Sequence, residues 1–160
     1  MLITAGPTYE AIDPVRFIGN HSSGLMGIEI ARAFADQGAE VTLVLGPSNI
    51  SVNKNNVNVL PVTSAKEMYD AVMALFPKTD IAVLSAAVAD FRPEMVADQK
   101  IKKNPDNDTF TIKLVKTEDI LKSVGNVRTD NQTIVGFALE TENGLENAKK
   151  KLHTKNIDLI

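Results

Sequence analysis

Short apolar runs recur along the chain and alternate with segments of helical periodicity. Most of these runs are almost continuously apolar, which is typical of strands covered on both faces. Six are predicted to be strands: Leu2–Ala5, Val41–Leu45, Val57–Val62, Ile81–Ser85, Thr133–Phe137 and Ile157–Ile160. The alternation predicts an α/β, Rossmann-like fold with a doubly wound, mostly parallel sheet.

The helical segments carry start signals. Four helices are predicted, beginning at Ser22 or Ser23, at Ser64, near Thr117 and at Asn143. The first should end near Gln37, because Gly38 can adopt the left-handed conformation that stops a helix. Glu67 and Glu146 stand three residues after the second and fourth start residues, so both starts are interpreted as capping boxes.

One segment interrupts the alternation. Lys100–Lys103 on one side and the alternating Phe110, Ile112 and Leu114 on the other flank a turn-rich stretch, residues 104–107. Alternating apolar residues around such a turn indicate paired strands. We therefore predict a β-hairpin flap between the fourth strand and the helix that follows.

Composition narrows the class of protein. With 160 residues, of which 44% are apolar, the chain is long enough for one domain. It has no apolar run of about 18 residues and no signal sequence, so we expect a cytoplasmic protein without membrane segments. Cysteine is absent, which excludes disulfides, thiolate metal sites and a cysteine nucleophile.

The formal net charge of −3 gives the molecule no general attraction for nucleic acid or anionic membranes. Positive charge is instead local, in two groups of lysines: Lys100, Lys102 and Lys103, and Lys149, Lys150, Lys151 and Lys155. Each group is either a solvated surface or a site for a phosphorylated ligand.

Ligands of an open parallel sheet bind at the carboxyl ends of its strands. About 18 residues separate the first strand from its helix, and a loop of this length is usually functional. It ends in Ser22, Ser23 and Gly24, and with Gly27 these residues present backbone amides and a helix amino terminus suited to phosphate. In the alternative interpretation, the serines only cap the helix and Gly27 only allows close packing.

Two further strand ends carry candidate residues. After the fourth strand, Ala86 and Ala87 would let a ligand approach the backbone, and Asp90 could bind a base, a sugar or a divalent cation. At the end of the fifth, Phe137 could stack on a base. The alternatives are a turn-forming Asp90 and a core Phe137. The G-x-G-x-x-G fingerprint and the acidic ribose ligand of NAD-binding proteins are both absent, which disfavours an oxidoreductase.

Taken in order, these segments resemble the phosphopantothenoylcysteine synthetase family, bacterial type. The resemblance covers essentially the whole chain and rests on an ordered set of blocks: Gly6-Pro7-Thr8, Asp13-Pro14-Val15-Arg16, Asn20 to Gly24, Met26-Gly27, Ala86 to Asp90, Lys100 to Lys103, Gly136 to Thr141 and Lys155 to Asp158. It implies a ligase of coenzyme A biosynthesis. In this family 4′-phosphopantothenate attacks CTP, and L-cysteine then displaces CMP from the acyl-cytidylate. Mg²⁺ accompanies the triphosphate.

The resemblance also implies roles for individual residues. Asn20 matches an asparagine that donates to the acyl oxygen, and Lys100 a lysine of the nucleotide and cysteine-dependent steps. The matched nucleotide-binding positions are Ser22, Ser23, Gly24, Ala86, Ala87, Asp90, Phe137, Lys151 and Lys155. Metal ligands are not identified, and ATP is an alternative to CTP. A nucleotide-binding module without turnover is the alternative function.

Two features of the resemblance bear on domain organisation. Bacterial members are often fused behind a flavin-dependent decarboxylase, so the chain is either a stand-alone synthetase or a domain excised from such a fusion. The family continues beyond the position of Ile160 with further strands and a helix. We therefore expect one nucleotide-binding domain over residues 1–160 that lacks the family's C-terminal segment and forms a homodimer when full length.

Overall fold

The computed structural model describes residues 1–103, 109–139 and 142–160. Within these residues, five strands form one parallel sheet in the order β5-β4-β1-β6-β9. They are β1 Leu2–Ala5, β4 Val41–Leu45, β5 Val57–Pro61, β6 Ile81–Leu84 and β9 Thr133–Gly136. Each corresponds to a predicted strand, and the bounds agree within one residue.

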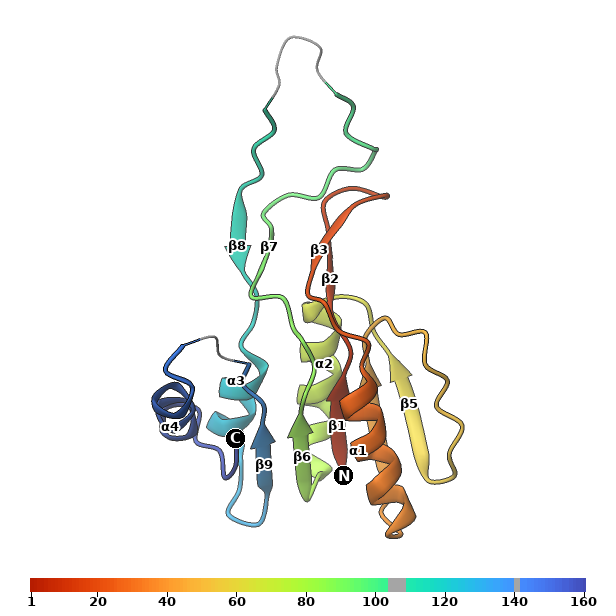
Figure 1. Cartoon of the computed structure of the whole chain (residues 1–160), viewed down its shortest axis with the longest axis vertical. Helices are drawn as coiled ribbons and strands as arrows, with labels where there is room; N and C mark the ends of the chain where they lie inside the picture. The colour runs from red at the N-terminus through yellow and green to blue at the C-terminus, as the bar shows by residue number, and fades with distance from the viewer. Residues whose placement is uncertain (104–108, 140–141) are drawn as a thin grey trace.

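Helices lie on both faces of the sheet (Figure 1). They are α1 Leu25–Asp36, α2 Ala65–Leu75, α3 Ile120–Val127 and α4 Gly144–Thr154, with a 3₁₀ turn at Phe76–Lys78. One core joins α1 to Ile3, and the other joins α2 and α3 to Leu2. These neighbouring residues enter opposite cores because successive side chains of a strand point to opposite faces. The predicted doubly wound fold is confirmed.

The strand order reverses at the centre of the sheet. From β1 the chain moves outward through β4 to β5, and then returns to the other side of β1 to form β6 and β9. The connections after β1 and β6 therefore leave in opposite directions, and their carboxyl ends flank a crevice in which ligands of such sheets bind.

The long loop after β1 contains a hairpin that its sequence did not indicate. β2 (Tyr9–Ala11) pairs with β3 (Phe17–Gly19) in antiparallel fashion. The rings of Tyr9 and Phe17 stack across this pair, with their centroids 3.9 Å apart. The hairpin is fixed to the body of the molecule, since the Tyr9 amide donates to the Thr63 carbonyl and the buried Glu10 carboxylate accepts from the Ala65 amide.

The flap is present, but its paired strands lie nearer the sheet than predicted. β7 (Phe91–Pro93) pairs with β8 (Leu114–Lys116), and the described residues between them extend away from the sheet (Figure 1). The described residues of Lys100–Lys103 and 109–113 form no strand, so the predicted strand positions there were wrong. The predicted turn at 104–107 lies outside the described residues.

The helix starts agree with the predictions only in part. The capping box of Ser64 and Glu67 is confirmed. The N-cap of α1 is Gly24, not Ser22 or Ser23. The φ of Gly24 is 79°, and no side chain caps this helix. Asn143 is the N-cap of α4, as predicted, but its φ is 52° and its side chain makes no capping hydrogen bond, so the predicted capping box is wrong. No helix in the described ranges is long and apolar enough to cross a membrane.

The predicted strand Ile157–Ile160 is reduced to one bridge, between Val135 and Leu159. The Asp158 carboxylate accepts a 2.7 Å hydrogen bond from the Ile134 amide, a donor that a regular ladder would use for a carbonyl. Arg128 also donates to this carboxylate. Asp158 therefore interrupts the strand by replacing a backbone acceptor with a side chain.

Candidate functional site

The chain segments that leave β1 and β6 remain joined beyond the sheet. The Ala87 amide donates to the Gly6 carbonyl at 2.9 Å, and the Thr8 amide donates to the Ala87 carbonyl at 3.3 Å. The buried Thr8 hydroxyl also accepts from the Ala89 amide at 2.9 Å. The predicted segment Ala86–Asp90 is thus held against the start of the long loop at the point where strand order reverses.

Asn20 lies immediately after β3 and contacts this segment. Its amide nitrogen donates to the carbonyls of Ala87, at 3.3 Å, and of Val88, at 3.0 Å. The structure therefore brings together two parts of the predicted site, Asn20 and the wall at Ala86 and Ala87. The resemblance assigns the Asn20 amide to the acyl oxygen of the intermediate. In this structure that amide donates to backbone carbonyls of the protein instead.

The start of α1 presents a polar surface beside Gly6. The Ser22 and Ser23 hydroxyls accept from the amides two residues ahead, at 3.3 Å, and both serines are exposed. The first turn of α1 contains no acidic residue. A side chain at Gly24 would approach the Gly6 backbone to 3.2 Å, so this turn requires glycine. The arrangement suits an anion on electrostatic grounds.

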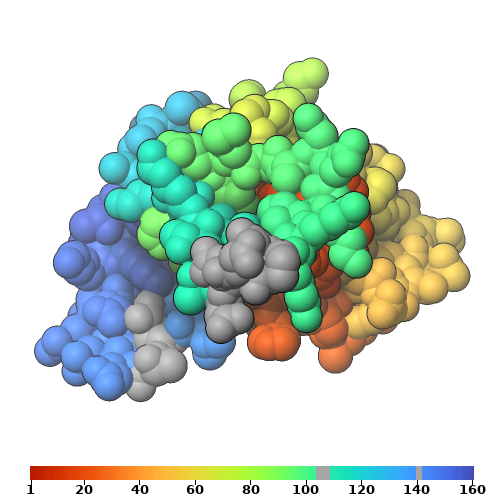
Figure 2. Space-filling view, turned by 90° about the horizontal axis from the view of Figure 1, so that it is seen from above, coloured from red at the N-terminus to blue at the C-terminus, as the bar shows by residue number. Residues whose placement is uncertain are grey.

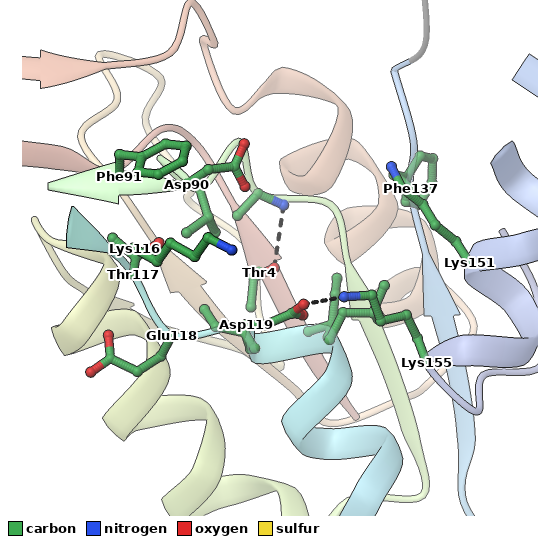
Figure 3. Close-up of a pocket in the computed structure, with 15 residues that line it drawn as sticks. Thr4, Asp90, Phe91, Lys116, Thr117, Glu118, Asp119, Phe137, Lys151 and Lys155 are labelled. Atoms are coloured by element: carbon green, nitrogen blue, oxygen red, sulfur yellow. Dashed lines mark hydrogen bonds and ion pairs between the residues drawn. The ribbon is translucent and has the colours of Figure 1, made fainter. Parts of the chain in front are cut away.

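A cavity of about 500 Å³ lies next to these segments, between β6, the base of the flap, α3 and α4. Five of the predicted nucleotide-binding residues line it: Ala86, Asp90, Phe137, Lys151 and Lys155. Asp90 and Phe91 form one side, and Phe137 with the two lysines forms the other (Figure 3). Aromatic rings, a carboxylate and ammonium groups therefore face one space, although they come from distant parts of the chain.

Lys155 forms an ion pair with Asp119 on the cavity wall (Figure 3). Asp119 is also the N-cap of α3, accepting from the Lys122 amide at 2.9 Å. Partial burial would raise the pKa of the Asp119 carboxyl, but the hydrogen bonds from Lys155 and from the Lys122 amide outweigh burial and lower it. Asp119 thus stays charged and orients Lys155 along the wall.

Sequence reasoning missed several cavity residues, among them Lys116, Thr117 and Asp119. Lys116, at the end of β8, extends its ammonium group toward the middle of the cavity, where Asp119 also points (Figure 3). Thr117, which follows β8, connects the returning strand of the flap to the segment Ala86–Asp90, because its hydroxyl donates to the Ala89 carbonyl at 2.6 Å. The signal that could have identified these residues is their position in the sequence, between the predicted flap and the next helix, where the chain returns to the carboxyl edge of the sheet.

The other predicted site residues lie outside the cavity lining: Asn20, Ser22, Ser23, Gly24, Ala87 and Lys100. Asn20 is nevertheless hydrogen-bonded to Val88, which lines the cavity. Lys100 is exposed and stands beside Ile101 on the first arm of the flap, which is the segment 94–103 after β7. The structure therefore divides the predicted residues among the cavity, the amide-rich loop and the flap.

No group of three or more His, Asp or Glu side chains suited to a metal ion occurs among the described residues. Mg²⁺ in nucleotide sites is usually held by one or two carboxylates together with substrate phosphates, so a protein cage is not required. The carboxylates of the cavity lining are Asp90, Glu118 and Asp119; Asp119 is already paired with Lys155, and the Glu118 carboxylate points away from the other charged side chains (Figure 3). Asp90 thus fits a metal that arrives with a phosphorylated ligand.

Comparison with known proteins shows which proteins this chain resembles. The family model for the C-terminal domain of the DNA/pantothenate metabolism flavoprotein matches residues 1–160. The chain is 53% identical to the coenzyme A biosynthesis bifunctional protein CoaBC of Haemophilus influenzae over 158 residues, which are 99% of this chain and 39% of that protein. It is 51% identical to a cysteine/cysteine sulfinic acid decarboxylase of an unknown prokaryotic organism, over all of this chain and 44% of that protein.

A solved structure agrees with the sequence comparison. The crystal structure of the C-terminal domain of a CoaBC protein matches 99% of this chain with a TM-score of 0.84 and 43% identity. The chain covers 74% of that domain, but less than half of the two longer relatives. The names of those relatives therefore describe proteins of which this chain corresponds to one part.

Proposed function

The chain belongs to the family of DNA/pantothenate metabolism flavoprotein C-terminal domains, and we propose that it ligates 4′-phosphopantothenate to L-cysteine using CTP. The observation that carries this proposal is the cavity at the carboxyl edge, in which Asp90, Phe137, Lys151 and Lys155 face one another. This set combines an aromatic surface for a base with two cations for phosphates, and a site for a nucleoside triphosphate requires both.

The proposed reaction has two steps. In the first, a carboxylate oxygen of 4′-phosphopantothenate attacks the α-phosphorus of CTP, and the bond to pyrophosphate breaks. In the second, the amine of cysteine attacks the acyl carbon, the bond to CMP breaks and the amine loses a proton. Both steps concentrate negative charge on phosphate oxygens, so catalysis needs cations and amide donors near the phosphates more than a protein nucleophile.

The residues divide this work in the proposal. Lys151 on α4 and Lys155 directly after it neutralise the phosphates, and Phe137 stacks on the base. The turn of the exposed Ser22 and Ser23 and of Gly24 supplies amides for phosphate or for the polarised acyl group. Asn20 donates to the acyl oxygen, for which its contact with Val88 must exchange.

Mg²⁺ would be held by the triphosphate and Asp90, and would reduce the charge against which the carboxylate attacks. The choice of CTP over ATP follows the bacterial type of the resemblance, with ATP as the alternative. The proposal includes action in the cytoplasm and assembly as a homodimer.

The decarboxylase name of one relative does not suggest a second function here, since this chain spans 44% of that protein. The alternatives are a binding module without turnover and an oxidoreductase, which the absence of the G-x-G-x-x-G fingerprint disfavours.

The test is pyrophosphate release by the chain with CTP or ATP, with and without 4′-phosphopantothenate and cysteine. Release that requires nucleotide and 4′-phosphopantothenate, with turnover sustained by cysteine, supports the ligase. Nucleotide binding without release would identify a module, and NADPH binding an oxidoreductase.

A further inference from the structure

Asp13 occupies an unusual position in the turn between β2 and β3. Its side chain is fully buried, and both carboxylate oxygens accept hydrogen bonds. Oδ1 accepts from the Val15 and Arg16 amides, each at 2.9 Å, and closes the turn. Oδ2 accepts from the Arg16 guanidinium and, at 3.1 Å, from the amide of Ile101 in the flap. The two oxygens thus serve different parts of the chain.

Ile101 is held from both sides of its backbone. Its amide donates to Asp13, and its carbonyl accepts a 2.9 Å hydrogen bond from the Arg16 guanidinium. Four residues earlier, the Ala97 amide donates to the Ile12 carbonyl at 3.0 Å. Seen from above, the green first arm of the flap lies against red residues of the amino-terminal loop (Figure 2). These contacts fix the backbone on which the exposed Lys100 stands.

The hairpin that carries Asp13 also carries Asn20. β3 ends at Gly19, and the Asn20 amide contacts the cavity wall at Val88. At its other strand, Glu10 is anchored to the start of α2. A rigid unit therefore links the body of the molecule, Asn20 and the backbone of Lys100, which come from segments about 80 residues apart in sequence.

We propose that Asp13 is a positioning residue that sets the place of Lys100 relative to Asn20 by holding the Ile101 amide, with Arg16 completing the clamp. This inference rests on the proposed ligase function for the role of Lys100, while the clamp itself is a property of the fold. A carboxylate is required, because one oxygen must face the Ile101 amide and a guanidinium while the other closes the turn.

The substitution Asp13→Asn separates the two oxygens. An asparagine can keep Oδ1 for the Val15 and Arg16 amides, whereas its NH₂ group would face the Ile101 amide and the guanidinium as a donor against donors. The turn is retained and the clamp is lost. The matched control is Glu94→Gln, which makes the same chemical change in the flap and breaks the exposed ion pair with Lys113.

The first measurement is amide hydrogen exchange in the full chain. Asp13→Asn should accelerate exchange of the Ile101 amide by on the order of tenfold, with the amides of β1 and β6 unchanged. Glu94→Gln should leave Ile101 unchanged. Unaltered Ile101 exchange in Asp13→Asn, or acceleration spread equally over the sheet, would overturn the clamp. This result does not depend on any enzymatic activity.

The second measurement is a double-mutant cycle with Lys100→Gln. Both single variants should slow conversion of the acyl-cytidylate to product by roughly ten- to hundredfold. Asp13→Asn combined with Lys100→Gln should be no slower than Lys100→Gln alone. Effects that multiply would contradict positioning through Lys100. If the wild-type chain releases no pyrophosphate, the proposed function fails, while the exchange result still decides the clamp.

Discussion

At the scale of residues, the site depends on charged side chains whose partners come from distant segments. Lys155, the C-cap of α4, is oriented by Asp119, the N-cap of α3, and Asp13 holds the flap through Arg16 and Ile101. Each arrangement uses a carboxylate with several hydrogen bonds to fix one cation or one amide. Their consequences are therefore best measured one residue at a time.

Lys155→Gln should weaken CTP binding by roughly ten- to hundredfold, because it removes a charge-assisted contact with phosphate. The loss should be smaller for CMP, which lacks the outer phosphates. Isothermal titration calorimetry with both nucleotides measures these affinities. The control is Lys149→Gln on the same helix, because Lys149 lies outside the cavity lining. Equal losses in the two variants would show that α4 acts only through its general charge.

The stability contributed by Asp13 should depend on pH. Hydrogen bonds from Arg16 outweigh burial and hold the pKa of this carboxyl well below its ordinary value of 3.8. A carboxyl with a lowered pKa in the folded state stabilises above the ordinary value, and this contribution is lost as the pH falls below it. The difference in melting temperature between wild type and Asp13→Asn should therefore be largest above about pH 5 and narrow toward about pH 3. A difference that is constant with pH would contradict this account of the charge.

At the scale of elements, strands that are buried on both faces could be predicted from the sequence. Elements that depend on single polar contacts could not. Val41–Leu45 was found as a strand because both of its faces are buried. The β2–β3 hairpin was missed because its three-residue strands depend on the Asp13 turn. At the carboxyl end, Asp158 replaces a backbone acceptor and reduces a predicted strand to a bridge.

The contact of α1 with β1 makes a prediction of its own. A Cβ at Gly27 would lie 2.5 Å from the Ala5 Cβ and from the Ser85 hydroxyl. Replacing glycine by alanine within a helix usually stabilises by up to about 1 kcal/mol, but overpacking costs about 1–3 kcal/mol. Gly27→Ala should therefore lower the free energy of unfolding in urea. Ala33→Gly, at an exposed position of α1, measures the helix propensity alone, and a gain in stability for Gly27→Ala would refute the close packing.

At the scale of the whole molecule, the central sheet brings loop, cavity and flap to one end. Of the five predicted cavity residues, Ala86, Asp90 and Phe137 follow the ends of β6 and β9, whereas Lys151 and Lys155 were identified through the resemblance and lie in and directly after α4. Lys116 and Asp119 were not identified, since their place depends on how the flap returns to α3. The position of Lys100 outside the cavity lining was equally unpredictable, because it depends on contacts with the β2–β3 turn.

The central claim is that the chain activates a carboxylate as an acyl-cytidylate. The most direct test is an isotope transfer with 4′-phosphopantothenate labelled with ¹⁸O in its carboxylate, together with CTP, Mg²⁺ and cysteine. If the carboxylate attacks the α-phosphorus, mass spectrometry should find one ¹⁸O in the CMP that is released. Label in inorganic phosphate with CDP as the product, or unlabelled CMP, would contradict the proposed mechanism.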